Sequence, residues 1–199
     1  MNDVNTQRLN KRAEEIRKDF RPARIVGPSS ILTLVIPILA LVAALQTRSI
    51  LLLNYVHVIT GGTWTGIDLF MGLVMSRVMR GLLPEARAEI IRKLVPIMLF
   101  FMPALASVAI TAGIYLAGWL GLDLFSPAMI AAGIIVIILS VQGFGFIMPN
   151  EVKIFLELRK DKPNLDKIVK LGMRNIYLSG SQTIFQIAII FVMAYFATI

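Results

Sequence analysis

The sequence predicts an all-α polytopic membrane protein, a bundle of five transmembrane helices. Two properties of its 199 residues indicate this class, since 57% are hydrophobic and only 16% are charged. Soluble domains contain about 45–50% apolar and about 25% charged residues. The third observation is that the apolar residues fall into five segments separated by charged connections. Backbone amides within lipid have no water to bond, so each segment is predicted to be a helix.

The five segments are compared with the length of about 20 residues that a helix needs to cross a bilayer. The predicted spans are residues 25–45, 50–75, 94–120, 127–148 and 176–199. The first reaches an adequate length only with residues 25–30 included. Pro84 is predicted to begin a helix that continues into the third span. Asn164 is predicted to cap a helix that leads toward the fifth. We therefore divide the chain into a tail, residues 1–24, and a transmembrane domain, residues 25–199.

The basic residues lie on one side of the predicted membrane. Residues 1–24, 76–93 and 149–175 contain every Lys and Arg of the chain except Arg48. The positive-inside rule assigns that side to the cytoplasm, so the N-terminus is predicted inside and the C-terminus outside. This distribution accounts for the formal net charge of +8 without a nucleic-acid partner. Membrane lipid, and the anionic cytoplasmic leaflet in particular, is the expected partner of these charges.

The tail, residues 1–24, carries a narrow apolar stripe at helical spacing, formed by Leu9, Ala13, Ile16 and Phe20. This stripe suits an amphipathic helix on the membrane surface, and the alternative is a solvated basic tail. No cleavage motif follows the first span, so we expect that span to act as a retained signal anchor.

The residues that are missing from the chain exclude several kinds of chemistry. There is no cysteine, which excludes disulfides, thiolate metal sites, cysteine nucleophiles and iron–sulfur clusters. A single histidine excludes a zinc site with two or three histidines from one chain. No phosphate-binding loop, serine-hydrolase, zinc-protease or dinucleotide motif occurs in a suitable context. Whether the protein is an enzyme is left open by the sequence.

A line of unusual residues runs along the second predicted span. Residues three, four and seven apart share one face of a helix. The line consists of His57, Gly61, Trp64, Asp68, Met71, Met75 and Met79, with Asn54 and Thr65 at its border. A matching line on the fifth predicted span consists of Asn175, Ser179, Gln182, Gln186 and Met193. We expect the two lines to face each other as a polar seam inside the bundle.

Asp68 is the residue of the seam that most needs an explanation. A charged group near the bilayer centre costs at least about 2.5–3.5 kcal/mol, so Asp68 is predicted to face the bundle interior or a wet cavity. Asp68, Gln182, Gln186 and Asn54 are the candidate residues of an ion or proton path. The alternative is that Asp68 only forms an inter-helix hydrogen bond to Gln182 or Gln186.

His57 lies about 16 Å from Asp68 along the helix axis, so the two cannot form one site within a chain. His57 is a candidate ligand of haem or of a metal, or a proton relay. The alternative is a neutral imidazole that bonds a neighbouring helix. Gly61, with Gly62, would leave a bare surface for a macrocycle beside His57 and Trp64, or would serve helix packing. Met71 and Met75 could, with His57, bind copper(I), or could be packing residues.

The segment HVITGGTWTGIDLFMGLVM resembles the H-x-x-x-x-x-x-W-x-G segment of a group of small bacterial and archaeal membrane proteins. This group includes the copper-resistance D type permeases and the small membrane protoporphyrinogen oxidases. The matching residues are His57, Trp64 and Gly66. The resemblance implies that His57 contacts haem b or copper, and that the protein resides in the plasma membrane of a prokaryote as a multi-pass protein.

Three functions follow as expectations. The first is a membrane redox or metal-handling protein that binds b-type haem, or copper, through His57. The opposite ligand position would go to a methionine, to water, or to His57 of a second subunit, which would make the protein a homo-oligomer. The second is a transporter or ion channel that uses the polar seam with Asp68. The third is a non-catalytic subunit of a membrane complex.

Overall fold

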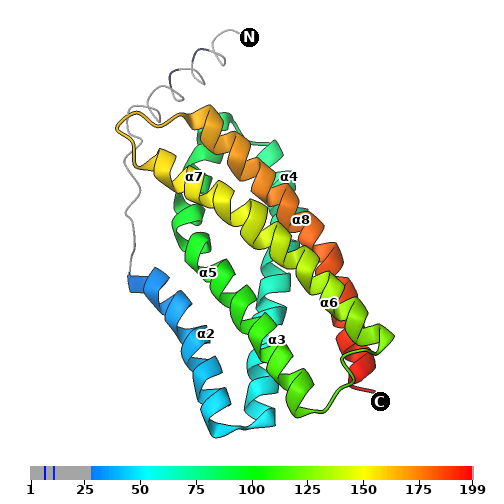
Figure 1. Ribbon diagram of the computed structural model, residues 1–199. Helices are drawn as coiled ribbons and strands as arrows, with labels where there is room; N and C mark the ends of the chain where they lie inside the picture. Colours follow the sequence, from blue (N-terminus) through cyan, green and yellow to red (C-terminus); the bar gives the residue numbers. More distant parts are fainter. Residues whose placement is uncertain (1–6, 8–10, 12–27, 199) are drawn as a thin grey trace.

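A computed structural model of the chain describes Gln7, Lys11 and residues 28–198. This part of the chain is all-helical, contains no strand, and forms five helices that pack side by side (Figure 1). The fold class predicted from the sequence is therefore confirmed at this level. The predicted surface helix of the tail, apart from Gln7 and Lys11, falls outside the described residues.

Three of the five helices are α-helical throughout, and two contain a π-helical segment. The uninterrupted helices are α2 (Pro28–Thr47), α5 (Pro84–Trp119) and α8 (Leu165–Phe196). The second helix of the chain consists of α3 (Ile50–Leu69), the π-helical η1 (Phe70–Met75) and α4 (Ser76–Arg80). The fourth consists of α6 (Pro127–Ser140), the π-helical η2 (Val141–Ile147) and α7 (Met148–Leu158).

The helix starts follow the local sequence signals. α5 begins at Pro84, as predicted, and runs without a break for 36 residues. The Asn164 side chain accepts a hydrogen bond from the Lys167 amide at 3.0 Å, which is the predicted cap. The helix it begins continues to Phe196, so the predicted short helix and the fifth span are one element. Two spans were predicted to end at residues 75 and 148, where the apolar composition ends. In the structure both helices continue past these positions, to Arg80 and Leu158.

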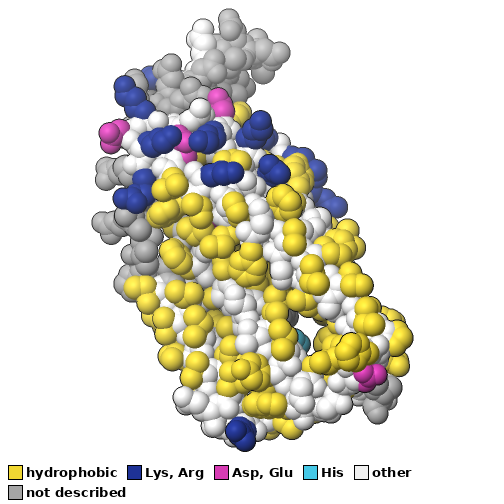
Figure 2. Space-filling view, in the orientation of Figure 1, with side chains coloured by type: hydrophobic (Ala, Val, Ile, Leu, Met, Phe, Trp, Pro, Cys, Tyr) yellow, Lys and Arg dark blue, Asp and Glu magenta, His cyan; other side chains and the backbone are white. Residues whose placement is uncertain are grey.

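Four of the five helices are long and apolar enough to cross a membrane, while α2 is apolar but shorter. Large apolar side chains point outward from these helices, with Leu51 80% and Phe191 78% exposed. Figure 2 shows these side chains over the length of the bundle, with Lys and Arg gathered at the end of the α4–α5 and α7–α8 turns, called here the basic end. Such an apolar surface suits lipid, which agrees with a multi-pass membrane protein.

The centre of the bundle is α5, which contacts α2, α3, α7 and α8. α2 lies against α3 and α5 only in the half of the bundle away from the basic end (Figure 1). Two buried apolar clusters matter for the site. The basic-end cluster consists of Met79, Ala88, Ile91, Val95, Ile154, Leu158, Ile168 and Ile176. The Trp64 cluster consists of Trp64, Leu105, Ala106, Ala109 and Leu139.

η1 and α8 approach each other most closely at two glycines. A Cβ atom added to Gly72 would lie 2.3 Å from the Gly180 Cα atom. A Cβ added to Gly180 would lie 3.1 Å from the Gly72 Cα atom. Real side chains do not tolerate the first distance, so this crossing depends on glycine at position 72. The crossing brings the polar faces of the two helices together.

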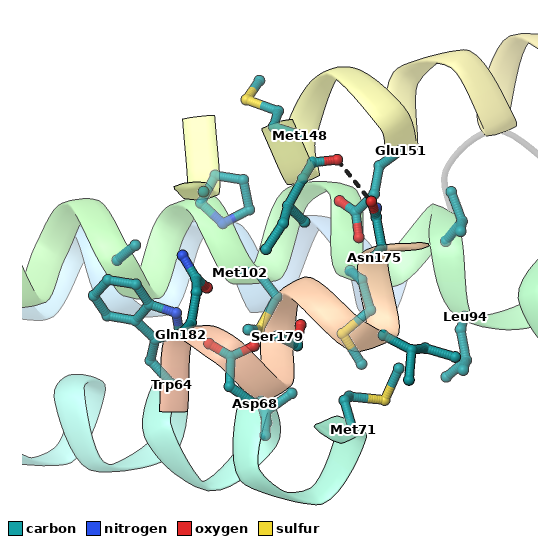
Figure 3. Close-up of a pocket in the computed structure, with 18 of the residues that line it drawn as sticks. Trp64, Asp68, Met71, Leu94, Met102, Met148, Glu151, Asn175, Ser179 and Gln182 are labelled. Carbon is teal, nitrogen blue, oxygen red and sulfur yellow. Dashed lines mark hydrogen bonds between the residues drawn. The ribbon is translucent and has the colours of Figure 1, made fainter. Parts of the chain in front are cut away.

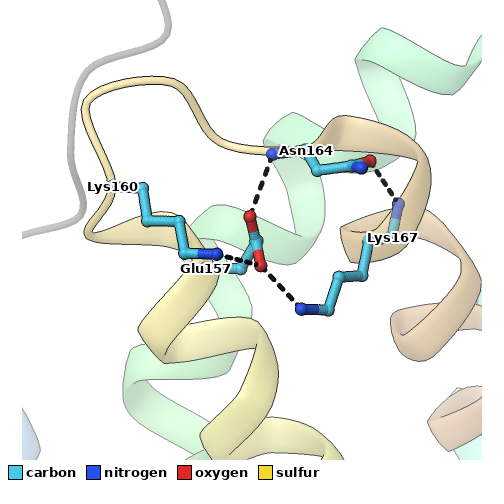
Figure 4. A network of polar contacts seen from close by, with 4 residues as sticks. All are labelled: Glu157, Lys160, Asn164 and Lys167. Atoms are coloured by element: carbon cyan, nitrogen blue, oxygen red, sulfur yellow. Dashed lines mark hydrogen bonds and ion pairs between the residues drawn. The ribbon is translucent and has the colours of Figure 1, made fainter.

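The turn between α7 and α8 is fixed by a carboxylate. Glu157 accepts hydrogen bonds from the side chains of Lys160 at 2.9 Å and Lys167 at 2.8 Å (Figure 4). It also accepts a hydrogen bond from the backbone amide of Asn164 at 3.3 Å. These bonds set where α8 begins and therefore which face of α8 meets α3.

Candidate functional site

The two polar lines predicted from the spacing face the interior of the bundle. On the helix formed by α3, η1 and α4, Trp64, Asp68 and Met79 are buried, and the other members of the line are half-buried. On α8 the buried residues are Asn175, Ser179, Gln182 and Gln186. The seam expected from the sequence is thus present between these helices.

Asp68 and Gln186 join the two lines directly. Their side chains are 0% and 1% exposed, and Gln186 Nε2 donates a hydrogen bond to Asp68 Oδ2 at 2.9 Å. Among the described residues, no donor has hydrogen-bond geometry to Asp68 Oδ1 or to Gln186 Oε1. Gln182 has a different partner, because its Nε2 donates to the carbonyl oxygen of Leu139 at 3.1 Å. The pair therefore keeps two buried oxygens available for a further partner.

A cavity of about 80 Å³ lies beside Asp68, between α3, η1, α5, η2, α7 and α8. Its polar lining residues are Asp68, Glu151, Asn175, Ser179 and Gln182, together with the Trp64 indole. The remaining lining is apolar and includes Met71, Met98, Met102 and Met148. Figure 3 shows the Trp64 indole nitrogen and the Ser179 hydroxyl on the side of the Asp68 carboxyl group. A volume of this size has room for several water molecules.

Glu151 of α7 is the second ionisable residue of the cavity. It is buried, and its carboxyl group points into the cavity (Figure 3). Asp68 and Glu151 line the same cavity. Of the described residues that line the cavity, only these two are ionisable, and none is Lys, Arg or His. Two carboxyl groups without a basic partner in a buried space require a cation or protons to balance them.

Sequence reasoning placed Asn150 and Glu151 where the fourth span reaches the cytoplasm and did not name Glu151 as a site residue, because that span was predicted to end at residue 148. The helix continues through Glu151 to Leu158, so Glu151 lies inside it. A signal was present, since Asn150 and Glu151 follow an apolar segment directly and share the helix with it. Asn150 bonds Asn175 Oδ1 at 2.9 Å, and Asn175 Nδ2 donates to the Ile147 carbonyl oxygen at 3.1 Å. These bonds fix α7 against α8 beside the Glu151 carboxyl group.

Both π-helical segments lie at the cavity. η1 begins two residues after Asp68 and contributes Met71, and η2 contributes Gly143, Phe144 and Ile147. π-helical turns inside α-helices occur frequently at functional sites, because the extra residue re-aims the side chains around it. Sequence periodicity did not reveal these segments.

Apolar clusters lie at both ends of the cavity. The Trp64 cluster separates it from the end of the bundle that carries His57, and the basic-end cluster separates it from the basic end. Trp64 and Leu139 belong to the first cluster and also line the cavity. Ile91 and Ile154 do the same for the second. The cavity thus lies within the seam between two apolar clusters.

His57 has surroundings of another kind. Its Nδ1 bonds the carbonyl oxygen of Ala109 on α5 at 2.8 Å. A Cβ atom added to Gly113 would lie 2.9 Å from His57 Cε1, so the imidazole rests directly on this glycine. The alternative of an imidazole that bonds a neighbouring helix is what the structure contains. With Nδ1 engaged, Nε2 is the ring nitrogen left for a ligand.

The predicted haem or copper ligands do not come together. Met71 lies about 21 Å from His57 along the helix. Met71 lines the cavity, and Met75 packs against the basic-end cluster. In the described chain there is no group of three or more His, Cys, Asp or Glu residues suited to a metal ion. The residues present around His57 thus offer one ligand nitrogen and do not fit a complete copper site.

Gly61 was predicted to leave a bare helix surface for a macrocycle, and the structure places it at a contact between two helices. A Cβ atom added there would lie 3.9 Å from Ala109 Cβ, so Gly61 belongs to the contact between α3 and α5. Gly62 and Gly66 have no atom of the described residues within 4 Å of an added Cβ, so an added methyl group would meet no neighbour in that part of the chain. Asn54 is exposed and lies away from Asp68, so the structure does not place it with the seam.

Comparison of the chain with models of protein families, with curated proteins and with solved structures finds no match. The geometry of the chain itself therefore carries the functional argument.

Proposed function

We propose that the protein is a multi-pass protein of a prokaryotic plasma membrane that carries a small cation through the seam between α3 and α8. The observation that carries this proposal is the cavity inside the bundle, which has two buried carboxyl groups, Asp68 and Glu151, and no basic residue among the described residues that line it. Intramembrane carboxyl groups that face a cavity mark ion and proton paths. Asp68 is the residue that binds the cation, and Gln186 orients its carboxyl group by donating a hydrogen bond to Oδ2.

The same proposal includes the orientation of the chain. The basic end would face the cytoplasm and the anionic leaflet. α2 would also cross the membrane, as the first of five spans, with the N-terminus inside and the C-terminus outside. Single-cysteine variants test it, because the chain has no cysteine of its own. A cysteine at Lys162, in the α7–α8 turn, would be labelled from the cytoplasmic side only. Labelling of that position from outside the cell would reverse the orientation.

Reconstitution in liposomes tests the proposed transport. Vesicles with an imposed membrane potential would be given Na⁺, K⁺ or a pH gradient in turn, and cation entry would be followed with ion-specific dyes. We expect entry of one of these cations with the native protein and its loss in Asp68→Asn. Asp123→Asn is the matched control, because Asp123 is exposed in the α5–α6 loop. Absence of entry for every cation, or equal entry in both variants, would contradict the proposal.

Ligation of haem b or copper by His57 is the second candidate function. It is supported by the hydrogen bond from Nδ1 to Ala109, which holds the ring with Nε2 as the ligand atom. The absorption spectrum and metal content of the purified protein test it. A haem protein would have a Soret band that His57→Ala removes, and a colourless, metal-free protein would rule this candidate out.

A further inference from the structure

The proposed function leaves the cation unnamed, and the composition of the cavity narrows the choice. We infer that the cation is a proton, which passes between the carboxyl groups of Asp68 and Glu151 through water in the cavity. This inference rests on the proposed function.

The described residues contain no group of three or more Asp, Glu, His or Cys side chains that could hold a metal cation of the hard, oxygen-seeking kind. Such ions take six or more oxygen ligands in proteins. Asp68 Oδ2 already accepts from Gln186, and Asn175 Oδ1 already accepts from Asn150. Most of the lining is apolar, including four methionines. A proton needs no coordination shell, because one O–H bond neutralises one carboxylate.

The Asp68 oxygen that has no hydrogen-bond partner among the described residues also favours a proton as the cation. Asp68 is fully buried, and its Oδ1 accepts no hydrogen bond from a described residue. A proton on Oδ1 turns this atom into a donor that can bond water or the Ser179 hydroxyl, which lies beside it (Figure 3). Oδ2 can keep its bond from Gln186 in both protonation states. The Asp68–Gln186 pair is therefore built to gain and lose a proton without rearrangement.

The ionisable groups that face Asp68 are limited to Glu151. α5 and α8 contribute no charged residue to the cavity lining, η1 and η2 contribute none, and α7 contributes only Glu151. The step is balanced as follows. Glu151 gives its proton to a neighbouring water while that water passes one of its own protons onward, and the last water in the row protonates Asp68. One proton leaves Glu151, one arrives at Asp68, and every water is regenerated.

The relay occupies the segment of the path between the two apolar clusters. Protons would reach Glu151 through the basic-end cluster and leave Asp68 past the Trp64 cluster, each after a local opening. η1 and η2 flank the relay and are the elements whose register could change during such an opening.

The test uses the full-length protein in liposomes with a pH-sensitive dye inside. With a membrane potential imposed, we expect acidification that is unchanged when Na⁺ and K⁺ outside are replaced by choline. Asp68→Asn and Glu151→Gln should each slow it at least tenfold, whereas Asp123→Asn should leave it unchanged. Entry of Na⁺ or K⁺ without a pH change would overturn the proton inference and leave the proposed cation transport intact. No entry of any cation would overturn both.

Infrared spectroscopy provides a readout that does not depend on transport. The native protein should show the C=O band of a protonated carboxyl group that shifts in D₂O, and the Asp68→Asn and Glu151→Gln variants should each lose part of it. Asn at position 68 can still accept from Gln186, so the fold should persist, which thermal unfolding would verify. Absence of this band from the native protein across the pH range in which it is folded would overturn the inference.

Discussion

His57 and Asp68 lie on the same face of α3, but their side chains are held in different ways. His57 is half-buried and bonds a backbone carbonyl of α5, an acceptor that any residue at position 109 would supply. Asp68 is fully buried and bonds a side chain of α8, and its second oxygen has no described donor. The Asp68 half also contains the cavity with the second carboxyl group, and both π-helical segments of the described chain.

This difference indicates that the two halves of the seam have different roles. A hydrogen bond from an imidazole to a backbone carbonyl holds two helices together and uses the ring nitrogen that forms it. A buried carboxyl group with an unused oxygen needs a mobile partner, which is a property expected of a transport site. We therefore expect substitutions in the Asp68 half to alter transport, and substitutions in the His57 half to alter stability alone.

The largest expected effect concerns the crossing that creates the Asp68 half. Gly72→Ala would place a Cβ atom against the backbone of Gly180, where no side chain can move aside. We expect a loss of about 3 kcal/mol in the free energy of unfolding, at the upper end of the range for overpacking. Unfolding in mixed detergent micelles measures it.

Gly62→Ala is the matched control on the same helix, because an added Cβ there meets no described atom within 4 Å. Alanine favours a helix over glycine by about 1 kcal/mol, so this variant should be as stable as the native protein or slightly more so. Equal stability of the Gly72 and Gly62 variants would show that η1 and α8 do not cross at these glycines.

The second effect concerns the bond between Asp68 and Gln186. Gln186→Leu removes the donor and leaves the buried Oδ2 without a partner, so a loss of about 1–3 kcal/mol in the free energy of unfolding is expected. In an Asp68→Leu background the same substitution should cost much less. A double-mutant cycle measures this coupling. Additive losses would mean that the two side chains do not interact.

The third effect concerns His57. His57→Phe keeps the ring and removes the bond to the Ala109 carbonyl, so a loss of about 1 kcal/mol is expected. Cation entry into liposomes should remain at the native rate once the amount of folded protein is matched. A loss of transport comparable to that of Asp68→Asn would place His57 on the path and remove the contrast between the two halves.

Spacing predicted the interior face of the seam well, because a helix repeats at a known angle. It placed Trp64, Asp68, Gln182 and Gln186 on buried faces, and all four are buried. Spacing could not choose the partner of each residue, which depends on how far one helix is displaced along another. Asp68 meets Gln186, whereas Gln182 meets a backbone carbonyl of α6. The close approach of Gly72 to Gly180 sets that displacement.

Asn54 was predicted as a site residue and Glu151 was not, whereas the structure places Glu151 at the cavity and Asn54 outside the seam, for different physical reasons. Glu151 lies in a helix that continues beyond its apolar segment, and composition does not reveal that the charged continuation turns inward. Asn54 borders the line in a helical projection, at the edge of the face of α3 that meets other helices. A border residue can then lie on either side of the contact, and the structure places Asn54 on the exposed side.

The smallest expected effect therefore concerns Asn54. Asn54→Leu should leave cation entry and the unfolding temperature at native values, because the side chain is exposed and lies outside the seam. Asn175→Leu is the matched substitution inside it. That variant loses the bonds to Asn150 and to the Ile147 carbonyl and should be less stable by about 1–3 kcal/mol. Slower entry in Asn54→Leu would mean that the path passes this residue on its way beyond the Trp64 cluster, whereas native entry would mean that the path does not pass it.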